Sequence, residues 1–302
     1  MSLIEQAANR LQALARTGVK LPWTPLGAES AAPLRPGVAA RIAASPVVQK
    51  APPRQGHQVQ IDLARLQRAG QLVPSLDGSR MADEFRHLKR SVLRLAADRD
   101  GPGQRRNALV MVTSSVPAEG KTFCAINLAM SIAMEIDTSV LLVDADVLRP
   151  GLPDRLGMPS TKGLFDALLD PGLDLSDLIL CTNIPKLSVL PTGTLGTRSA
   201  ELLASTAMNR LLEELACRYD DRIVIFDGPP LLATPGAQTL AGRVGQVVMV
   251  VEAGRTPRRL VGQAFAMLEQ CPNVVSILNR FDTAREPLLD GYYGHPREKR
   301  LP

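Results

Sequence analysis

The stretch ALVMVTSSVPAEGKTFCAINLAMSIAM, residues 108–134, decides the fold. It opens with the apolar run ALVMV (108–112), which has the length and composition of a buried strand. A polar loop follows that ends in Gly120, Lys121 and Thr122, and CAINLAMSIAM then favours a helix. A strand, such a loop and a helix in this order are the context of a Walker A phosphate-binding loop. The stretch therefore predicts nucleotide binding at a strand–helix junction.

The residue types of this loop suit a phosphate ligand. Gly120 allows a turn whose backbone N–H groups face phosphates, and Lys121 can reach the β and γ oxygens. The hydroxyl of Thr122 is placed to ligate Mg²⁺ at the start of the helix. Ser115 stands where the standard pattern has its first glycine, so the match is incomplete. The alternative is an accidental Gly-Lys-Thr at a helix start, which the agreement of strand, loop and helix disfavours.

Two acidic elements follow the loop in the sequence. VLLVDADVLRP (140–150) places Asp144 and Asp146 at a strand's carboxyl end, and their i, i+2 spacing puts both carboxylates on one side of an extended chain. One can ligate Mg²⁺ while the other takes a proton. IVIFDGPPLL (223–232) ends a strand with Asp227, the Walker B position, where a carboxylate holds Mg²⁺. A helix cap followed by a solvated loop is the alternative for the first pair.

Further apolar runs indicate the rest of the fold. Short runs rich in Val, Ile and Leu occur at 140–145, 187–190, 222–227, 246–251 and 273–278. They alternate with helical segments, of which the longest are 121–136, 199–219 and 256–270. Continuous apolarity in the runs indicates strands covered on both faces, hence a mostly parallel sheet between helices. We expect a doubly wound α/β domain of the P-loop NTPase class.

The N-terminal region reads differently from this domain. Residues 2–17 favour an amphipathic helix, which we expect to be a docking helix within residues 1–20; a solvated terminus is the alternative. Prolines and alanines recur without periodicity over 21–57, which is typical of a flexible linker. A second helix is predicted over 81–97, in a helical segment that spans 58–106.

Composition limits the function classes. The net charge is +5, but residues 1–80 carry ten Lys or Arg against four Asp or Glu, so the excess lies N-terminal to the sheet domain and a nucleic-acid partner is not expected. The four cysteines form no C-x-x-C pair, which argues against metal or disulfide frameworks. No apolar run approaches the roughly 18 residues that span a bilayer. We expect any membrane connection to go through a partner.

With these motifs in place, the chain resembles the bacterial tyrosine kinases, P-loop enzymes of capsule and exopolysaccharide export. Their loop pattern S-S-x-P-G-E-G-K-[ST] corresponds to SSVPAEGKT here, in which Ala118 replaces the usual glycine; the loop is strained if Ala118 needs a positive φ. Their D-x-D-x-R motif is matched by Asp144 and Asp146, but Leu148 replaces the arginine and Arg149 follows it. The resemblance implies that nucleotide is bound by Ser115, Ala118, Glu119, Gly120, Lys121, Thr122 and Phe123, with Asn279 reading adenine.

The resemblance extends beyond the loop. DEFRHLKR (83–90) is similar to the family's E-x-x-R-x-x-R motif, which implies that Asp83, Arg86 and Lys89 serve a ring-like oligomer. The segments ELLAS (201–205), VVEAGRT (250–256) and SILNR (276–280) also look familial. The narrowest resemblance is to the tyrosine autokinases of exopolysaccharide loci associated with PEP-CTERM/exosortase systems. It is carried by MSLIEQAANRL, QIDLARLQRAGQLVP, ADEFRHLKR and the terminal GYYG.

The C-terminal tail, residues 284–302, follows the kinase domain expected over 107–283. Family members carry a tyrosine cluster there that is phosphorylated in trans, which implies that Tyr292 and Tyr293 are phospho-acceptors. A packing or interface pair is the alternative for these two residues. Tyr219 is expected to lie in the core. A phosphate on the tail would add charge and weaken the assembly.

The resemblance implies an ATP- and Mg²⁺-dependent tyrosine autokinase that regulates exopolysaccharide polymerisation and export. Lys121, Asp144 and Asp146 would be its catalytic residues, with Asp144 accepting the phenolic proton and Thr122, Asp146 and Asp227 around the metal. The implied partner is a membrane-embedded polysaccharide chain-length or copolymerase protein, which would hold the kinase in the cytoplasm at the inner membrane.

Two other function classes remain open from sequence. A positioning ATPase of the ParA/MinD type shares this fold, but those proteins carry a signature lysine five residues before the catalytic one, where this chain has Val116. A nucleotide-binding scaffold that has lost phosphoryl transfer is the other, and it is consistent with Ala118, Leu148 and the small tyrosine cluster.

Overall fold

The computed structural model describes residues 57–74, 79–98, 104–219 and 221–281. All of them lie in one compact unit that spans residues 52–302. The predicted docking helix, the linker up to residue 56 and the tail with Tyr292 and Tyr293 lie outside the described residues.

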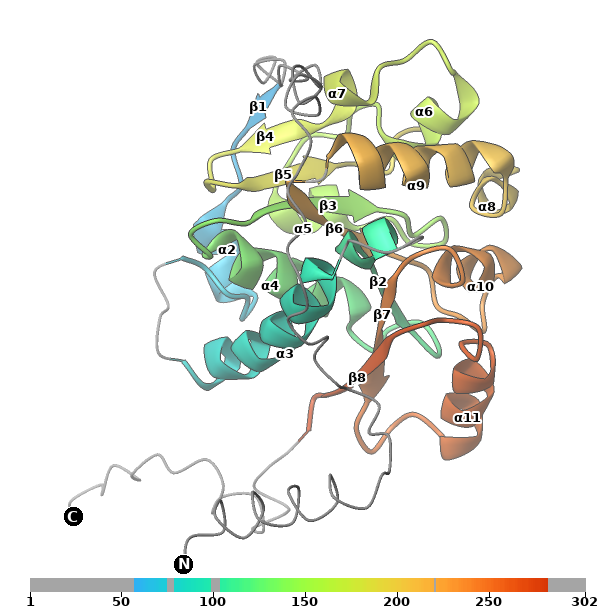
Figure 1. Ribbon diagram of the computed structural model, residues 1–302. Coiled ribbons are helices and arrows are strands. Elements are labelled where there is room, and N and C mark those ends of the chain that lie inside the picture. Colours follow the sequence, from blue (N-terminus) through green and yellow to red (C-terminus); the bar gives the residue numbers. More distant parts are fainter. Residues whose placement is uncertain (1–56, 75–78, 99–103, 220, 282–302) are drawn as a thin grey trace, which may run out of the picture. The chain divides into compact units, whose positions relative to one another are not determined.

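An eight-stranded sheet forms the centre of this unit, in the order β1-β4-β5-β3-β6-β2-β7-β8 (Figure 1). Every neighbouring pair is parallel except β4 and β5. The mostly parallel sheet predicted from the sequence is thus confirmed. The strands are β1 Gln58–Val59, β2 Leu109–Ser114, β3 Ser139–Asp144, β4 Leu180–Thr182, β5 Leu187–Leu190, β6 Arg222–Asp227, β7 Gln246–Glu252 and β8 Val274–Asn279.

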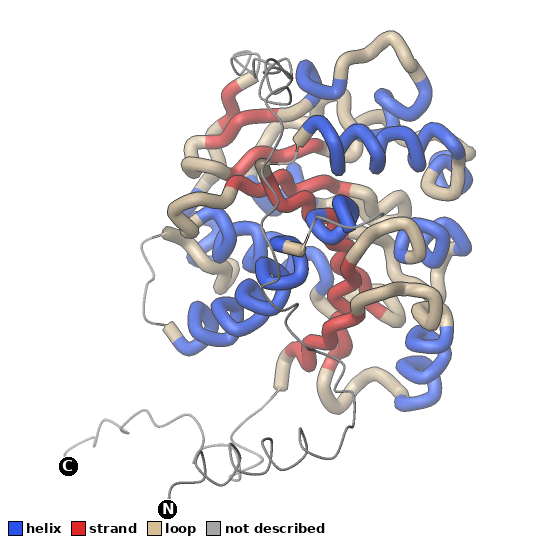
Figure 2. The backbone as a smooth tube through the Cα atoms, in the orientation of Figure 1, coloured by secondary structure: helices blue, strands red, loops and turns tan. Residues whose placement is uncertain are grey.

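Helices cover both faces of the sheet: Figure 2 shows helices, in blue, on both sides of the strands, in red. They are α2 Leu63–Arg68, α3 Arg80–Ala97, α4 Lys121–Ala133, α5 Leu152–Leu156, α6 Leu164–Leu169, α7 Leu175–Leu178, α8 Ser199–Leu202, α9 Thr206–Arg218, α10 Pro235–Ala241 and α11 Arg258–Ala266, with a 3-10 helix, η1, at Gln104–Ala108.

The helices on each face of the sheet enclose a separate hydrophobic core. Along β2, Val110 and Val112 face the core beneath α2 to α5, whereas Leu109 and Met111 face the core beneath α6 to α11. Successive side chains of a strand point to opposite faces, so a strand apolar at every position fills both cores. This explains why the strand runs show no alternation in the sequence.

The structure corrects the expected elements in two places. It adds the short strands β1 and β4, which are too brief to stand out as apolar runs. It also divides the helix expected at 199–219 into α8 and α9. Ser205 caps α9 by accepting a hydrogen bond from the N–H of Met208, and Arg243 donates to the carbonyls of Leu203, Ala204 and Ser205. A distant arginine thus stabilises the break.

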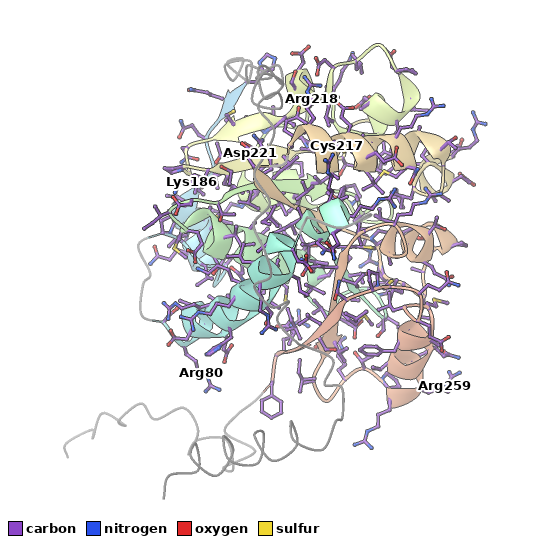
Figure 3. The ribbon with its side chains drawn as sticks, viewed as in Figure 1. Arg80, Lys186, Cys217, Arg218, Asp221 and Arg259 are labelled. Carbon is purple, nitrogen blue, oxygen red and sulfur yellow. The ribbon has the colours of Figure 1, made fainter. Side chains whose placement is uncertain are left out.

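Tyr219, expected in the core, is half-buried at the end of α9. The guanidinium groups of Arg218 and Arg222 lie 5.6 and 4.9 Å from the centre of its ring, and Figure 3 shows Arg218 beside this helix end. Such cation–π contacts suit a ring at the boundary between core and solvent. None of the described helices is long and apolar enough to cross a membrane.

Candidate active site

The ends of three neighbouring strands meet at one edge of the sheet. β2 ends at Ser114, and its neighbour β6 ends at Asp227. β3 lies on the other side of β6, and its last residue, Asp144, stands opposite Asp227 in the strand register. Ligands of such sheets bind beyond the carboxyl ends of the strands. The structure thus brings the loop after β2 together with both acidic elements.

The loop between β2 and α4 has an unusual backbone. Ala118 has φ 74° and Gly120 has φ 97°, both in the left-handed region. Glycine adopts such angles readily, whereas the Cβ of Ala118 makes them unfavourable. Gly120 is the N-cap of α4, and within the described residues no side chain caps this helix end. The first amides of α4 therefore remain for an anion, which the helix dipole also favours.

Lys121 lies between the acidic side chains. Its ammonium group contacts the carboxylate of Asp146 and lies 3.8 Å from Oδ1 of Asp227 and 3.4 Å from Oγ1 of Thr122. Burial alone would lower the pKa of Lys121, but attraction by Asp227 and Asp146 outweighs it and raises the pKa above its ordinary value. The lysine is therefore a fixed positive charge in the site.

The loop after β3 is organised by Asp144 and Asp146. Oδ2 of Asp144 accepts hydrogen bonds from the N–H groups of Gly151 and Leu152, both at 3.1 Å. Oδ1 of Asp146 accepts from the N–H groups of Leu148 and Arg149 at 3.0 and 3.1 Å. Burial raises the pKa of Asp144, against the opposing effect of its own backbone donors, which include Gly151 and Leu152. Oδ2 of Asp146 is left to face Lys121.

In the second family motif, Leu148 stands at the arginine position and Arg149 follows it. The side chains of both residues are exposed. The backbone N–H of each nonetheless serves Asp146, at the distances given above. An N–H group needs no particular side chain, so replacing the family's arginine with Leu148 leaves this turn intact.

Two buried polar groups at this edge have no hydrogen-bond partner in the described part of the chain, although Lys121 lies 3.8 Å from one of them, Asp227. Both carboxylate oxygens of Asp227 and the hydroxyl oxygen of Ser115 accept or donate no hydrogen bond there. Asp227 is completely buried, and burial raises its pKa to about 7, against the attraction of Lys121. A buried carboxylate without hydrogen bonds is costly unless a cation or donor completes its surroundings.

These observations fit a magnesium ion and a phosphate ligand. Thr122, Asp146 and Asp227 offer hard oxygen ligands of the kind that Mg²⁺ prefers, and the free oxygens of Asp227 are suited to it or to a water of its shell. Among the described residues, no group of three or more His, Cys, Asp or Glu is arranged to hold a metal alone. Mg²⁺ commonly takes only one or two carboxylates and completes its shell with phosphate and water.

Glu119 and Asn279 lie on the opposite side of the loop from the aspartates. The Glu119 side chain is buried, and its carboxylate accepts hydrogen bonds from the N–H of Val116, the N–H of Glu252 and the hydroxyl of Thr256. The amide of Asn279 donates to the carbonyl of Glu119 at 2.8 Å. Both side chains thus hold the loop in place on its β7 and β8 side.

Phe123, also expected at the nucleotide, is the third residue of α4 and half-buried against the core beneath α2 to α5. The structure therefore places Lys121 and Thr122 beside the aspartates, whereas the side chains of Glu119 and Phe123 pack against the protein.

The expected oligomerisation residues lie on α3. Asp83 and Arg86 form an ion pair on a partly exposed part of the helix. Lys89 is buried: its ammonium group donates to the carbonyl of Ser131 at 3.1 Å and pairs with Glu135 at 2.5 Å. It therefore fastens α3 to α4 within one chain.

Two residues that hold the loop, Glu252 and Thr256, were missed from the sequence as site residues. Both lie in the segment VVEAGRT, which resembles the family pattern, so a signal was present without a role. Their role depends on β7 lying beside β2, which the register shows and the sequence order does not.

The fold and the site together define a P-loop nucleotide-binding protein. No family model matches the chain. It is 34% identical over 192 residues to the tyrosine-protein kinase YwqD of Bacillus subtilis (strain 168), covering 63% of this chain and 79% of that protein. It is 32% identical over 203 residues to the succinoglycan biosynthesis transport protein ExoP of Rhizobium meliloti (strain 1021), covering 66% of this chain and 25% of that protein.

A solved structure gives the same result. The kinase domain of the Escherichia coli tyrosine kinase ETK matches with 27% identity and a TM-score of 0.56, over 67% of this chain and 78% of that one. The chain therefore belongs to the family of bacterial tyrosine kinases, and its enzyme class is protein-tyrosine kinase.

Proposed function

We propose that this chain transfers the γ-phosphoryl group of ATP to Tyr292 and Tyr293 in the tail of a neighbouring copy. The observation that carries the proposal is the meeting of Lys121 with Asp146 and Asp227 beside the left-handed loop. Membership in the tyrosine kinase family supports a tyrosine hydroxyl as the phosphate acceptor. The two adjacent tyrosines beyond the last strand would provide that hydroxyl.

The chain's own residues suggest how the triphosphate is held. The amides at the start of α4 and the hydroxyl of Ser115 would face its oxygens, and Lys121 would neutralise the charge between the β and γ phosphates. Mg²⁺, held by Thr122, Asp146 and Asp227, would supply charge neutralisation on the transferring group. To reach phosphate, the Lys121 ammonium would turn away from Asp146.

The acceptor hydroxyl must lose its proton. In the proposed step the tyrosine oxygen bonds to the γ phosphorus, the bond from that phosphorus to the β–γ bridging oxygen breaks, and ADP leaves. Asp144 would take the phenolic proton, since burial raises its pKa and so favours a protonated carboxyl group. Asp146, released from Lys121, would hold the metal.

Assembly is the second part of the proposal. A tail can serve a neighbour only if copies associate, and the partly exposed pair Asp83 and Arg86 on α3 is the proposed contact of a ring-like homo-oligomer. Because Lys89 is engaged with α4, its replacement is expected to lower folding stability as well. Light scattering should show a smaller assembly for Arg86→Ala, and thermal unfolding should show an unchanged Tm. Lys89→Met should lower both the size of the assembly and the Tm.

The proposed cellular role is control of exopolysaccharide polymerisation and export, at the cytoplasmic side of the inner membrane. A membrane-embedded chain-length or copolymerase protein would hold the kinase there by binding residues 1–20. Nucleic acid is not among the proposed partners. The relative named for succinoglycan transport, in which the matching region is a quarter of a longer protein, supports such a link. Unchanged co-purification with that partner after deletion of residues 1–20 would remove this part.

The direct test is incubation of the full-length chain with ATP and Mg²⁺, followed by intact-mass measurement and phosphotyrosine detection. The wild type should gain phosphate, while Lys121→Met and the double variant Tyr292→Phe/Tyr293→Phe should not. Phosphotyrosine unchanged in Lys121→Met would contradict the proposal. ATP binding without any phosphotyrosine in the wild type would instead favour a silent scaffold.

A further inference from the structure

The carboxylate of Glu119 is turned away from the phosphate side of the loop. Only 1% of the residue is exposed, and two backbone N–H groups donate to its two oxygens, from Val116 at 2.8 Å and from Glu252 at 3.2 Å. The hydroxyl of Thr256 donates to the same oxygen as Glu252. A buried carboxylate surrounded by three donors is stabilised by strong, charge-assisted hydrogen bonds and is not available to a ligand.

These bonds hold a loop that is strained. Ala118, next to Glu119, has φ 74°, and Gly120 on its other side has φ 97°. Strained backbone of this kind persists only where its surroundings fix it. The bond from Val116 closes the loop on itself, and the bonds from Glu252 and Thr256 fasten it to the end of β7.

Hydrogen bonds from the end of β8 complete a closed ring. The side-chain amide of Asn279 donates to the Glu119 carbonyl at 2.8 Å, and its oxygen accepts from the N–H of Arg280 at 2.9 Å. The guanidinium of Arg280 then pairs with Glu252 at 2.8 Å. This pair holds the pKa of Glu252 below its ordinary value. The ring therefore runs from Glu119 through Glu252, Arg280 and Asn279 back to Glu119.

Close packing leaves this ring little freedom. A Cβ built on Gly120 would lie 2.1 Å from the side-chain nitrogen of Asn279, and Glu252 stands opposite Asn279 in the register of β7 and β8. A movement of the phosphate-binding loop therefore requires a movement of the end of β8. The expected tail, residues 284–302, begins four positions after Arg280.

We propose that Glu119 is a positioning residue, whose carboxylate fixes the phosphate-binding loop to the ends of β7 and β8 and thereby couples nucleotide binding to the root of the tyrosine-bearing tail. The tail's role in this inference rests on the proposed function. Coupling of this kind is reciprocal: nucleotide at the loop orders the end of β8, and disruption at β8 weakens nucleotide binding by the same factor.

Thr256 offers a matched pair of variants for the test, because Thr256→Ser keeps the hydroxyl and Thr256→Val keeps the shape. Glu119→Gln removes the charge, and Glu269→Gln makes the same change at an exposed position as a control. In the full-length chain, Glu119→Gln should raise the KM for ATP by about tenfold with kcat changed less than about threefold, since a lost charge-assisted bond weakens binding by roughly that factor. Thr256→Val should raise the KM for ATP by a smaller factor, and Thr256→Ser should keep the KM of the wild type.

Amide hydrogen exchange tests the coupling without relying on catalysis. In the wild type, a non-hydrolysable ATP analogue should slow exchange at Val116, Glu252 and Arg280 together. In Glu119→Gln and Thr256→Val the effect at Arg280 should be lost, while Thr256→Ser and Glu269→Gln retain it. If Glu119→Gln fails to fold, the comparison of Thr256→Val with Thr256→Ser still tests whether the loop is coupled to the end of β8.

An unchanged KM in Glu119→Gln, or slowing at Arg280 that persists in Thr256→Val, would overturn the inference. If the wild type binds the analogue but makes no phosphotyrosine, the proposed function fails, and the exchange experiment still decides whether the ring couples loop to β8.

Discussion

Two buried acids flank the phosphate-binding loop, and their surroundings differ. Glu119, on the β7 side, accepts hydrogen bonds from Val116, Glu252 and Thr256. Asp227, on the β6 side, has no hydrogen-bond partner in the described ranges for either oxygen. A carboxylate whose donors are supplied by the fold stabilises the fold, whereas one without donors is left for a ligand. The loop thus has a structural side and a chemical side.

Replacement of Lys121 by Met should have the largest effect on the chemical side. The variant loses the cation that faces both the aspartates and the proposed phosphates, so phosphotyrosine formation should fall by about a thousandfold. It also leaves Asp146 and Asp227 without their buried counter-charge, so Tm should fall. Phosphate incorporation and thermal unfolding measure both. Activity within tenfold of the wild type would contradict the assignment of Lys121.

Asp227→Asn should separate activity from stability. Loss of the proposed metal-binding carboxylate should lower phosphotyrosine formation by about a hundredfold. Removal of a buried charge without hydrogen bonds should raise Tm in nucleotide-free protein at pH 8. Glu119→Gln should instead lower Tm, because it breaks satisfied bonds. If both variants shift Tm in the same direction, the distinction between the two sides fails.

The pH dependence of stability sharpens the same contrast. The pKa of Asp227 is raised to about 7 by burial, above the ordinary value of 3.8. The folded state therefore holds a proton that the unfolded state releases, and the stability due to Asp227 is lost as pH rises from about 4 to about 7. Urea unfolding without nucleotide should show this loss in the wild type relative to Asp227→Asn. An identical pH dependence in the two proteins would contradict the raised pKa.

The smallest effect is expected at Ala118. Glycine adopts the left-handed φ of 74° without the Cβ conflict, so Ala118→Gly should raise the free energy of unfolding by about 1 kcal/mol. Denaturant unfolding can resolve this difference. A decrease would show that the unfolded-state entropy of glycine outweighs the relief.

Those elements that local pattern determines were predictable from the sequence. Strand runs, the Gly-Lys-Thr end of the loop and the aspartates at strand ends all depend on neighbouring residues, and strand register brings Asp144 beside Asp227 as parallel geometry requires. The break between α8 and α9 depends on Arg243, about 40 residues away, and could not be read locally.

Side-chain direction was the other unpredictable feature. Glu119 sits between Ala118 and Gly120 in a loop expected to face phosphate, yet its carboxylate points to Thr256, which is 137 positions away. Lys89 lies on a helix whose sequence suggests a surface motif, yet its ammonium contacts α4. Such contacts follow from which elements the fold places together, and the local sequence pattern does not show them.

The most direct test of the central claim mixes two full-length variants, neither of which is expected to gain phosphate when incubated alone. Lys121→Met keeps its tail tyrosines but lacks the proposed catalytic lysine, and Tyr292→Phe/Tyr293→Phe keeps the site but lacks the proposed acceptors. After incubation with ATP and Mg²⁺, intact-mass measurement should find phosphate on the Lys121→Met chain only when the second variant is present. Phosphate on that chain alone, or no phosphate on it in the mixture while the wild type is modified, would contradict transfer from one copy's site to another's tail.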